Sequence, residues 1–142
     1  MTMIIVDTCE LCLLVSKLDS QNELYRLGTD WFVNDYQGAG SRPRLVVQPQ
    51  QHITDMGHLS PSALQTLGLI MGNVCDAIKR ESNVERVYIL SFNETGPGHI
   101  HFHFVPRFTS DVNIGPNLSN DILVPQFDTL RVIRRLTFLF TL

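Results

Sequence analysis

Three histidines at alternate positions, His99, His101 and His103, form the densest cluster of reactive side chains in the sequence. In a β-strand, alternate side chains point to one face, so these three imidazoles are expected to form a row. Neighbours in such a row stand roughly 6.5–7 Å apart, and mutual repulsion keeps at least some of them neutral near pH 7. A neutral imidazole acts as a nucleophile, a general base or a metal ligand.

Two alternatives to a histidine nucleophile stay open on these residues alone. Histidines on a strand can bind one catalytic metal ion, and a half-exposed strand can also carry histidines that have no chemical role. Three histidines within the run HIHFH, out of five in the whole chain, make a purely structural role the least favoured interpretation. The choice between a nucleophile and a metal ligand depends on the sequence around the three histidines.

Two of the three cysteines, Cys9 and Cys12, form a C-x-x-C pair in the run CELC. The odd cysteine count and this spacing favour metal binding or a reactive thiol over a disulfide framework. Two apolar cysteines packed in a helix would look the same in sequence. A structural zinc ion needs four ligands, so two more would have to come from elsewhere in the chain. Cys75 is expected to pack inside a helix rather than to react.

The segments that must position these residues predict an α+β domain. Ser60 and Pro61 provide an N-cap and a first-turn proline for a main helix that ends near Arg80. Apolar residues in that helix recur at steps of three and four, at Leu64, Leu67, Met71, Val74 and Ile78. Runs rich in β-branched and aromatic residues predict about five strands in an antiparallel sheet, at residues 24–27, 31–34, 45–47, 86–92 and 100–105. A short helix at 9–17 and a C-terminal helix at 127–136 complete the domain.

Length and charge exclude several classes of protein. The 142 residues suffice for one domain, and 44% hydrophobic content is enough to form a core. A formal net charge of −3 gives no reason to expect a nucleic acid or an anionic membrane as partner. Asp7 and Glu10 interrupt the apolar N-terminus, so we expect neither a signal peptide nor a membrane span, and we place the protein in the cytoplasm.

The segment GHIHFHFVPR at 98–107 resembles the signature of the histidine triad (HIT) family, in which apolar residues separate three histidines ahead of Pro-Arg. The resemblance extends upstream to the strand RVYILSFN with its terminal Asn93, to the helix that starts at Ser60, and to VVQPQQH, which ends at His52. It covers about residues 9 to 107. The triad motif is specific, and it favours a nucleophilic histidine over a three-histidine metal site.

The family resemblance implies nucleotidyl transfer. In such proteins the central histidine attacks the α-phosphate of a nucleotide conjugate, and water then releases a nucleoside monophosphate. By position the nucleophile is His101, while His103 would donate a hydrogen bond to the phosphate or to the leaving group and His99 would orient the site or bind metal. Transferase relatives usually carry glutamine at the third position, so His103 favours a hydrolase. The resemblance also implies a homodimer that binds a small nucleotide substrate.

CELC resembles the C-x-x-C of the zinc-containing branch of the family. In that branch the tetrahedron is completed by the histidine after the VVQP-type strand and by the first histidine of the triad. The resemblance therefore implies a structural zinc ion on Cys9, Cys12, His52 and His99. The expected organisation is a single domain at 1–142, with a zinc-binding segment at 1–22 and a C-terminal loop and helix at 108–142. His58 is expected to be a solvated loop residue.

The sequence departs from the family pattern at the residues that bind substrate. The loop NETGPGH is shorter than usual and lacks the Gln-Ser/Thr pair, so the expected phosphate donors are Asn93, the amides of Gly96 and Gly98, and Thr95. The usual Gly-His before the LVV strand is replaced by Arg42, Pro43 and Arg44. Arg44 is expected to hold a phosphate, with a solvated surface charge as the alternative. Asn34 or Asp35 is expected to contact the ribose.

Two other functions stay open. The shortened loop would suit a nucleotide-binding or regulatory protein with weak turnover, and the three histidines could instead serve a metal-dependent hydrolase. The apolar C-terminus from Leu136 is the expected contact between subunits. Neither the base, the leaving group nor the pathway follows from these residues.

Overall fold

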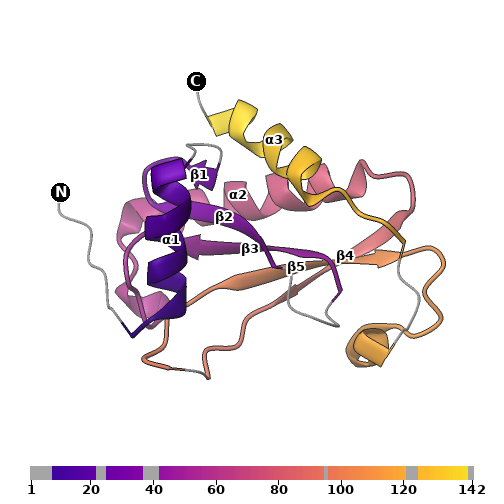
Figure 1. Ribbon diagram of the computed structural model, residues 1–142, viewed down its shortest axis with the longest axis horizontal. Helices are drawn as coiled ribbons and strands as arrows, with labels where there is room; N and C mark the ends of the chain where they lie inside the picture. The colour runs from indigo at the N-terminus through magenta and orange to yellow at the C-terminus, as the bar shows by residue number, and fades with distance from the viewer. Residues whose placement is uncertain (1–7, 22–24, 37–41, 95, 121–124, 141–142) are drawn as a thin grey trace.

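A computed structural model describes residues 8–21, 25–36, 42–94, 96–120 and 125–140 of the chain. Three helices and five strands make up its regular structure (Figure 1). The helices are α1 (Glu10–Gln21), α2 (Pro61–Lys79) and α3 (Thr129–Phe140). The strands are β1 (Arg26–Leu27), β2 (Trp31–Tyr36), β3 (Arg44–Pro49), β4 (Val84–Leu90) and β5 (Phe102–Phe108). Two short 3-10 helices, η2 (Met56–His58) and η3 (Gly115–Asn120), lie in the connections.

The five strands form one antiparallel sheet in the order β1-β2-β3-β5-β4. The predicted α+β fold, with its main helix and C-terminal helix, is therefore confirmed. None of the helices in the described part of the chain is both long and apolar enough to cross a membrane.

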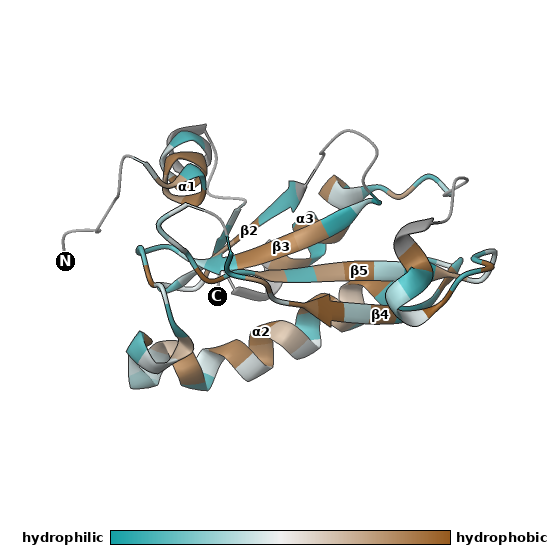
Figure 2. Ribbon diagram, turned by 90° about the horizontal axis from the view of Figure 1, so that it is seen from below, coloured by the Kyte–Doolittle hydropathy of each residue, from teal (hydrophilic) through white to brown (hydrophobic). Residues whose placement is uncertain are grey.

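The hydrophobic core lies between the sheet and two helices, α2 and α3. Figure 2 shows α2 on one face of the sheet and α1 on the other. On the α2 face, alternate residues of the central strands are fully buried, among them Val33, Leu45 and Phe104. Helix α3 packs against α2 and against β1 and β2. The opposite face of the sheet is left for the candidate site.

Hydrogen bonds at the N-terminus of α2 fix the position of this helix. The hydroxyl of Ser60 accepts a hydrogen bond from the amide of Ala63 at 3.1 Å, and the indole of Trp31 donates to the carbonyl of Ala63 at 3.1 Å. The predicted cap is thus present. The buried stripe of α2 consists of Ala63, Leu67, Ile70, Val74, Ala77 and Ile78. Leu64 is 43% exposed, so its predicted place in the stripe is wrong, because Ala63 occupies the contact with the sheet.

The last strand begins later than the sequence suggested, at Phe102 instead of residue 100. Ile100 and Phe102 enter the core as expected from the alternation. His99 and His101, however, lie in the extended segment before β5. There the amide of Ile100 donates to the carbonyl of Ile53 at 2.8 Å rather than to a neighbouring strand. His103 alone of the three therefore lies within β5, but all three histidines still line one cavity, as the alternation predicted.

A buried ion pair attaches the segment after β5 to the sheet. The guanidinium of Arg42 donates to both carboxylate oxygens of Asp111, at 3.1 and 2.7 Å, and to the carbonyls of Pro106 and Leu118. The side chains of Arg42 and Asp111 are 6% and 0% exposed. Asp111 also accepts from the amide of Phe108, at 2.6 Å. Arg42 is thus a structural residue in the interior rather than a surface charge.

The proposed subunit contact at the C-terminus lies mostly outside what the structure describes. Leu136 is 0% exposed within the protomer and belongs to the core. The side chains of residues 137–142 are not among those described. Leu136 itself is therefore not available to a second subunit.

We expect Asp111→Ala to lower the free energy of unfolding by about 3 kcal/mol or more, because it leaves the buried guanidinium of Arg42 without its partner. Asp76→Ala is the matched control, since the Asp76–Arg80 pair is 65% and 62% exposed and should contribute about 0.5 kcal/mol or less. Urea denaturation of both variants measures the difference. Equal, small effects of the two substitutions would contradict this account of the ion pair.

Candidate active site and metal centre

The four predicted zinc ligands lie together at one end of the sheet. Cys9 precedes α1, Cys12 lies in its first turn, His52 follows β3, and His99 precedes β5. The Nδ1 atom of His99 lies 3.5 Å from Sγ of Cys9 and 3.4 Å from Sγ of Cys12, and Nδ1 of His52 lies 3.3 Å from Sγ of Cys12. One ligand atom from each of the four residues lies within 4.8 Å of every other.

These distances fit a tetrahedral zinc ion. Zinc–sulfur bonds of about 2.3 Å and zinc–nitrogen bonds of about 2.0–2.1 Å place sulfur and nitrogen ligands roughly 3.5 Å apart. Cys9, Cys12 and His99 are buried, and two thiolates with two imidazoles are a common structural zinc set. The cluster therefore fits a zinc site, as the sequence predicted. Bound there, zinc would cross-link α1, the segment after β3 and the segment before β5.

His99 is held in the form that a metal requires. Its Nε2 lies 3.0 Å from the carbonyl oxygen of Pro49, which can only accept, so Nε2 carries the proton and Nδ1 offers its lone pair to the cluster. Burial lowers the pKa of His99 from 6.5 to about 4, against the opposing hydrogen bond to Pro49. The ring is therefore neutral at pH 7.

His101 has the opposite arrangement of its two ring nitrogens. Its Nδ1 lies 2.8 Å from the backbone carbonyl of His99, so Nδ1 donates the hydrogen bond and Nε2 keeps its lone pair. The hydroxyl of Ser91 donates to the carbonyl of His101 at 2.8 Å and fixes this peptide. A half-buried imidazole with a free lone pair on Nε2 has the form of a nucleophile.

His103 packs edge-on against His101, with 4.9 Å between ring centroids. Burial, with smaller contributions from the charges of His101 and Arg44, lowers the pKa of His103 from 6.5 to about 4. His103 is thus neutral at pH 7 and carries a single N–H to donate. In the described residues, the potential metal ligands that cluster include His99 but neither His101 nor His103. This arrangement speaks against a metal ion held by all three histidines.

The triad histidines open into a cavity of about 790 Å³ on the face of the sheet opposite α2. Its lining comes from α1 and the residues just before it, from β2, β3 and β5, and from the loop before β5. The predicted residues that line it are Asn34, Arg44, Asn93, Gly96, His99, His101 and His103. Arg42 does not line it, because its guanidinium is engaged by Asp111 in the interior.

Of the two candidates for the ribose contact, only Asn34 faces the cavity. Asn34 is 3% exposed and its Nδ2 donates to the carbonyl of Asp35 at 3.3 Å, while its Oδ1 is buried without a partner among the described residues. Asp35 points to the other face, where it accepts from the hydroxyl of Thr129 at 3.1 Å. The prediction for Asp35 is wrong, because successive residues of β2 face opposite sides of the sheet.

Asn93 lines the cavity and is also hydrogen-bonded within the loop. Its Nδ2 donates to the carbonyl of Thr54 at 2.6 Å, and its Oδ1 accepts from the amide of His99 at 2.9 Å. Gly98 has φ +80°, and an added Cβ would lie 3.3 Å from Oδ1 of Asn93. Asn93 thus holds the segment that carries the histidines, while its second N–H leaves the donor role toward a phosphate as a prediction. Thr95 lies outside the described residues.

Sequence reasoning missed the apolar part of the cavity lining. Leu11 and Leu14 of α1 and Val46 of β3 contribute to it. Val46 could have been found, because β3 pairs with β5 and places it opposite His103. The contribution of α1 follows from long-range packing, since Nε2 of Gln48 donates to the carbonyl of Leu11 at 3.3 Å.

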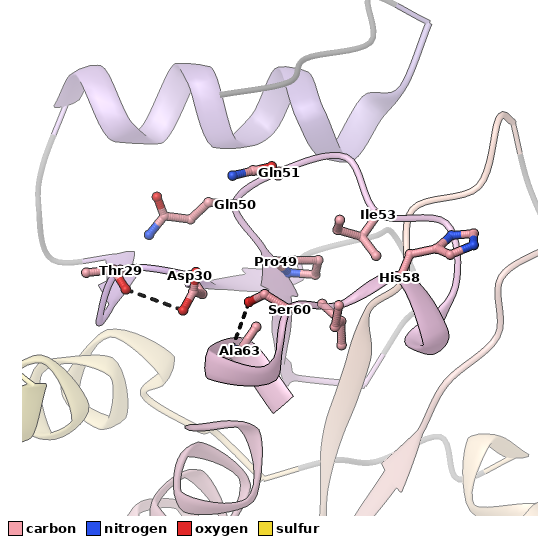
Figure 3. A pocket seen from close by; sticks show the side chains of 10 residues that line it. Thr29, Asp30, Pro49, Gln50, Gln51, Ile53, His58, Ser60 and Ala63 are labelled. Atoms are coloured by element: carbon pink, nitrogen blue, oxygen red, sulfur yellow. Dashed lines mark hydrogen bonds between the residues drawn. The ribbon is translucent and has the colours of Figure 1, made fainter. Parts of the chain in front are cut away.

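A smaller hollow of about 330 Å³ lies near the N-terminus of α2 (Figure 3) and contains no triad histidine. Asp30, which lines it, accepts hydrogen bonds from the hydroxyls of Thr29 and Ser62 at 3.3 and 3.4 Å. His58, which lines it, is exposed, as expected for a loop residue. The triad cavity, which contains His101 with its lone pair on Nε2, is therefore the candidate site.

Comparisons with solved structures place the fold. The chain superposes on a zinc-bound histidine triad family protein from Mycobacterium smegmatis with TM-score 0.57 at 17% identity, covering 90% of this chain and 94% of that one. A HIT family protein from Bacillus anthracis gives TM-score 0.55 at 20% identity, with 84% of each chain covered. A Hit-like protein involved in cell-cycle regulation from Bartonella henselae gives a TM-score of 0.56 at 15% sequence identity. That superposition covers 89% of this chain and 97% of the other. No family model and no curated protein matches the sequence. The chain has the histidine triad fold.

Purified protein is expected to contain about one zinc ion per chain, measured by atomic emission. His52→Ala removes one of the four ligands and should abolish most of this content, and it should lower the melting temperature because three segments lose their cross-link. Cys75→Ser is the control, since Cys75 is a thiol outside the cluster. Equal zinc content in His52→Ala and Cys75→Ser would contradict the assignment.

Proposed function

We propose that this protein is a nucleotide hydrolase of the histidine triad family that forms a covalent nucleotidyl intermediate on His101. The observation that carries the proposal is the 2.8 Å contact from Nδ1 of His101 to the carbonyl of His99, which leaves the lone pair on Nε2. The same ring lines a cavity large enough for a nucleotide. The three HIT structures with this fold support the family assignment.

The reaction proceeds in two balanced steps. The lone pair on Nε2 of His101 attacks the α-phosphorus and forms a phosphorus–nitrogen bond, while the bond from phosphorus to the leaving oxygen or nitrogen breaks. The leaving group takes that electron pair and, where its basicity requires one, a proton from solvent. Water then attacks phosphorus, the phosphorus–nitrogen bond breaks with its electron pair returning to Nε2, and the water gives up a proton. The products are a nucleoside monophosphate and the free leaving group.

The remaining residues of the cavity bind and orient the substrate. Asn34 offers its unpartnered Oδ1 to a ribose hydroxyl, and His103 donates its one N–H to the phosphate or the leaving group. The amides of Gly96 and Gly98 and the guanidinium of Arg44 bind phosphate oxygens. Because the protein carries a formal charge of −3, attraction for an anionic substrate comes from these local donors.

Zinc, when bound, supplies a structural cross-link and no reacting group. Its expected ligands Cys9 and Cys12 require a reducing environment, which supports a cytoplasmic location. We propose that residues 1–142 form one domain, with 1–22 as the zinc-binding segment and 108–142 as a C-terminal loop and helix.

A homodimer is also part of the proposal, in line with the family resemblance. Strand β4 is an edge strand of the described sheet, so its outer hydrogen-bonding groups are available to a second copy. Ile89 is 40% exposed on it.

A second candidate function is nucleotide binding with weak turnover. The engagement of Asn93 by Thr54 and His99 favours it, because the short loop then presents fewer donors to the phosphate. Such a protein would bind a nucleoside monophosphate without forming an adduct.

The test is incubation with dinucleoside polyphosphates, nucleoside phosphoramidates and adenylylated sugars, followed by mass spectrometry of the quenched protein. We expect a nucleotidyl adduct on His101, and a loss of turnover of at least about a thousandfold in His101→Ala. Zinc content should be unchanged in that variant, because His101 lies outside the ligand set. The control His58→Ala should retain adduct and turnover. Activity retained in His101→Ala would contradict the nucleophile, and binding without any adduct would favour the second candidate.

A further inference from the structure

A second cavity adjoins the triad cavity on the same face of the sheet. It measures about 920 Å³, and Arg44 lines both cavities. Its lining is mostly apolar and comes from β4, β5 and η3, including Leu90, Val105, Pro116 and Leu118. In the part of the chain that the structure describes, no aspartate or glutamate lines it. The cavity thus combines an apolar interior with a cation at the boundary to the triad.

The strand register sets the order of groups along the sheet. Val46 of β3 and Leu90 of β4 stand opposite His103, and Tyr88 stands opposite Val105, the next residue of β5 on that face. Arg44 precedes Val46 by two residues and so shares its face. From His101 the sheet therefore presents His103, then Arg44, and then the apolar cavity. A leaving group bound beside Arg44 would thus lie next to the second cavity, which Arg44 also lines.

The outer wall of the cavity is fixed by buried contacts. The hydroxyl of Tyr88 accepts from the amide of Gly115 at 2.9 Å, and Arg42 donates to the carbonyl of Leu118 at 3.5 Å. The Arg42–Asp111 pair holds the segment that leads into η3. At the mouth, Leu90 and Phe92 are 42% and 65% exposed, so apolar surface faces solvent directly beside the polar triad. Two arginines line the cavity, Arg42, which is paired with Asp111, and Arg44 at the boundary to the triad. A preformed, mostly apolar cavity with a few charged groups is the usual design of a small-molecule site.

We infer that this cavity binds the leaving group of the substrate, and that the leaving group is an alkyl or aryl phosphate. The substrate class is then a nucleoside diphosphate esterified to an apolar group. Arg44 binds the β-phosphate and the apolar group lies among Leu90, Val105 and Leu118. This inference rests on the proposed function, since it deepens the substrate class of the same site.

With this leaving group, one bond to the α-phosphorus forms and one breaks. Nε2 of His101 forms a bond to the α-phosphorus, the bond from the α-phosphorus to the bridging oxygen breaks, and the bridging oxygen keeps the electron pair. The product is a phosphate monoester, whose second pKa is about 6, so it leaves at pH 7 mainly as a dianion and needs no proton. An amine leaving group would instead need a proton from solvent to leave as a neutral amine.

Three synthetic adenosine substrates test separately whether the cavity binds the apolar group and whether Arg44 binds the β-phosphate. They are the β-hexyl ester of adenosine 5′-diphosphate, its β-methyl ester, and the N-hexyl phosphoramidate of adenosine 5′-monophosphate. We expect kcat/KM for the hexyl ester to exceed that for the methyl ester at least about tenfold, because the methyl ester leaves the cavity unfilled. We also expect the hexyl ester to exceed the phosphoramidate, which lacks the β-phosphate.

Two variants and one control test the residues. Leu90→Ser should lower the hexyl-to-methyl ratio at least about threefold, and Arg44→Gln should lower the ratio of the hexyl ester to the phosphoramidate about tenfold. The control is Leu64→Ser, since Leu64 on α2 is 43% exposed, against 42% for Leu90, and lies outside the cavity. Equal ratios in Leu90→Ser and the unmodified protein would overturn the inference.

Binding of hexyl phosphate alone keeps the inference distinct from the proposed function. Calorimetry should show that hexyl phosphate binds, and that affinity falls in Leu90→Ser and Arg44→Gln but not in Leu64→Ser. This result supports the cavity even where no substrate forms an adduct and the hydrolase proposal fails. The inference would be overturned if hexyl phosphate does not bind, or if its affinity is the same in Leu90→Ser and Arg44→Gln as in the unmodified protein. A third result would also overturn it. If sedimentation shows that Leu90→Ser dissociates a dimer while the kcat/KM ratios of the substrates stay unchanged, the surface around Leu90 is a subunit contact.

Discussion

The hydrogen bond from Nδ1 of His101 to the carbonyl of His99 is the constraint on which the site depends. It fixes the tautomer of His101 and hence the nitrogen that holds the lone pair. The same residue, His99, turns its side chain into the cysteine cluster and donates from Nε2 to Pro49. The carbonyl that orients the candidate nucleophile is thus held in place by its own side chain, so that the metal centre and the reactive centre share one residue. Loss of the metal would release both.

The rest of the molecule can be understood as support for that segment. Asn93 clamps the amide of His99, and the Ile100 amide binds the carbonyl of Ile53, so the histidines are fixed before the regular strand begins. The α2 face of the sheet is committed to the core, which leaves the opposite face for polar groups. On that face Arg44 provides positive charge beside His103 and lines both the triad cavity and the apolar cavity.

Local patterns predicted the elements because periodicity and capping are local properties. The alternation of apolar residues in the triad segment placed Ile100, Phe102 and Phe104 in the core, and Ser60 and Pro61 gave the start of α2. The donor set of the metal cluster followed from a motif resemblance. The choice between Asn34 and Asp35 did not follow, because a shift of one residue in register exchanges the faces of a strand.

The structural roles of Arg42 and Asn93 also could not be predicted from the sequence. Arg42 is buried because Asp111, 69 residues later, lies beside it, and Asn93 is engaged because Thr54 lies across the loop. Neither partner is marked by a local pattern. The contacts of His99 were not marked locally either, since its partners Cys9, Cys12 and Pro49 are distant in sequence.

The central claim is that His101 carries its proton on Nδ1 and its lone pair on Nε2. Long-range proton–nitrogen correlation NMR of the zinc-loaded protein at neutral pH measures this directly, with the His101 signals assigned by their absence in His101→Ala. The account predicts a protonated Nδ1 and an unprotonated Nε2 for His101. A proton on Nε2, or equal nitrogen shifts from rapid exchange between the two tautomers, would contradict it.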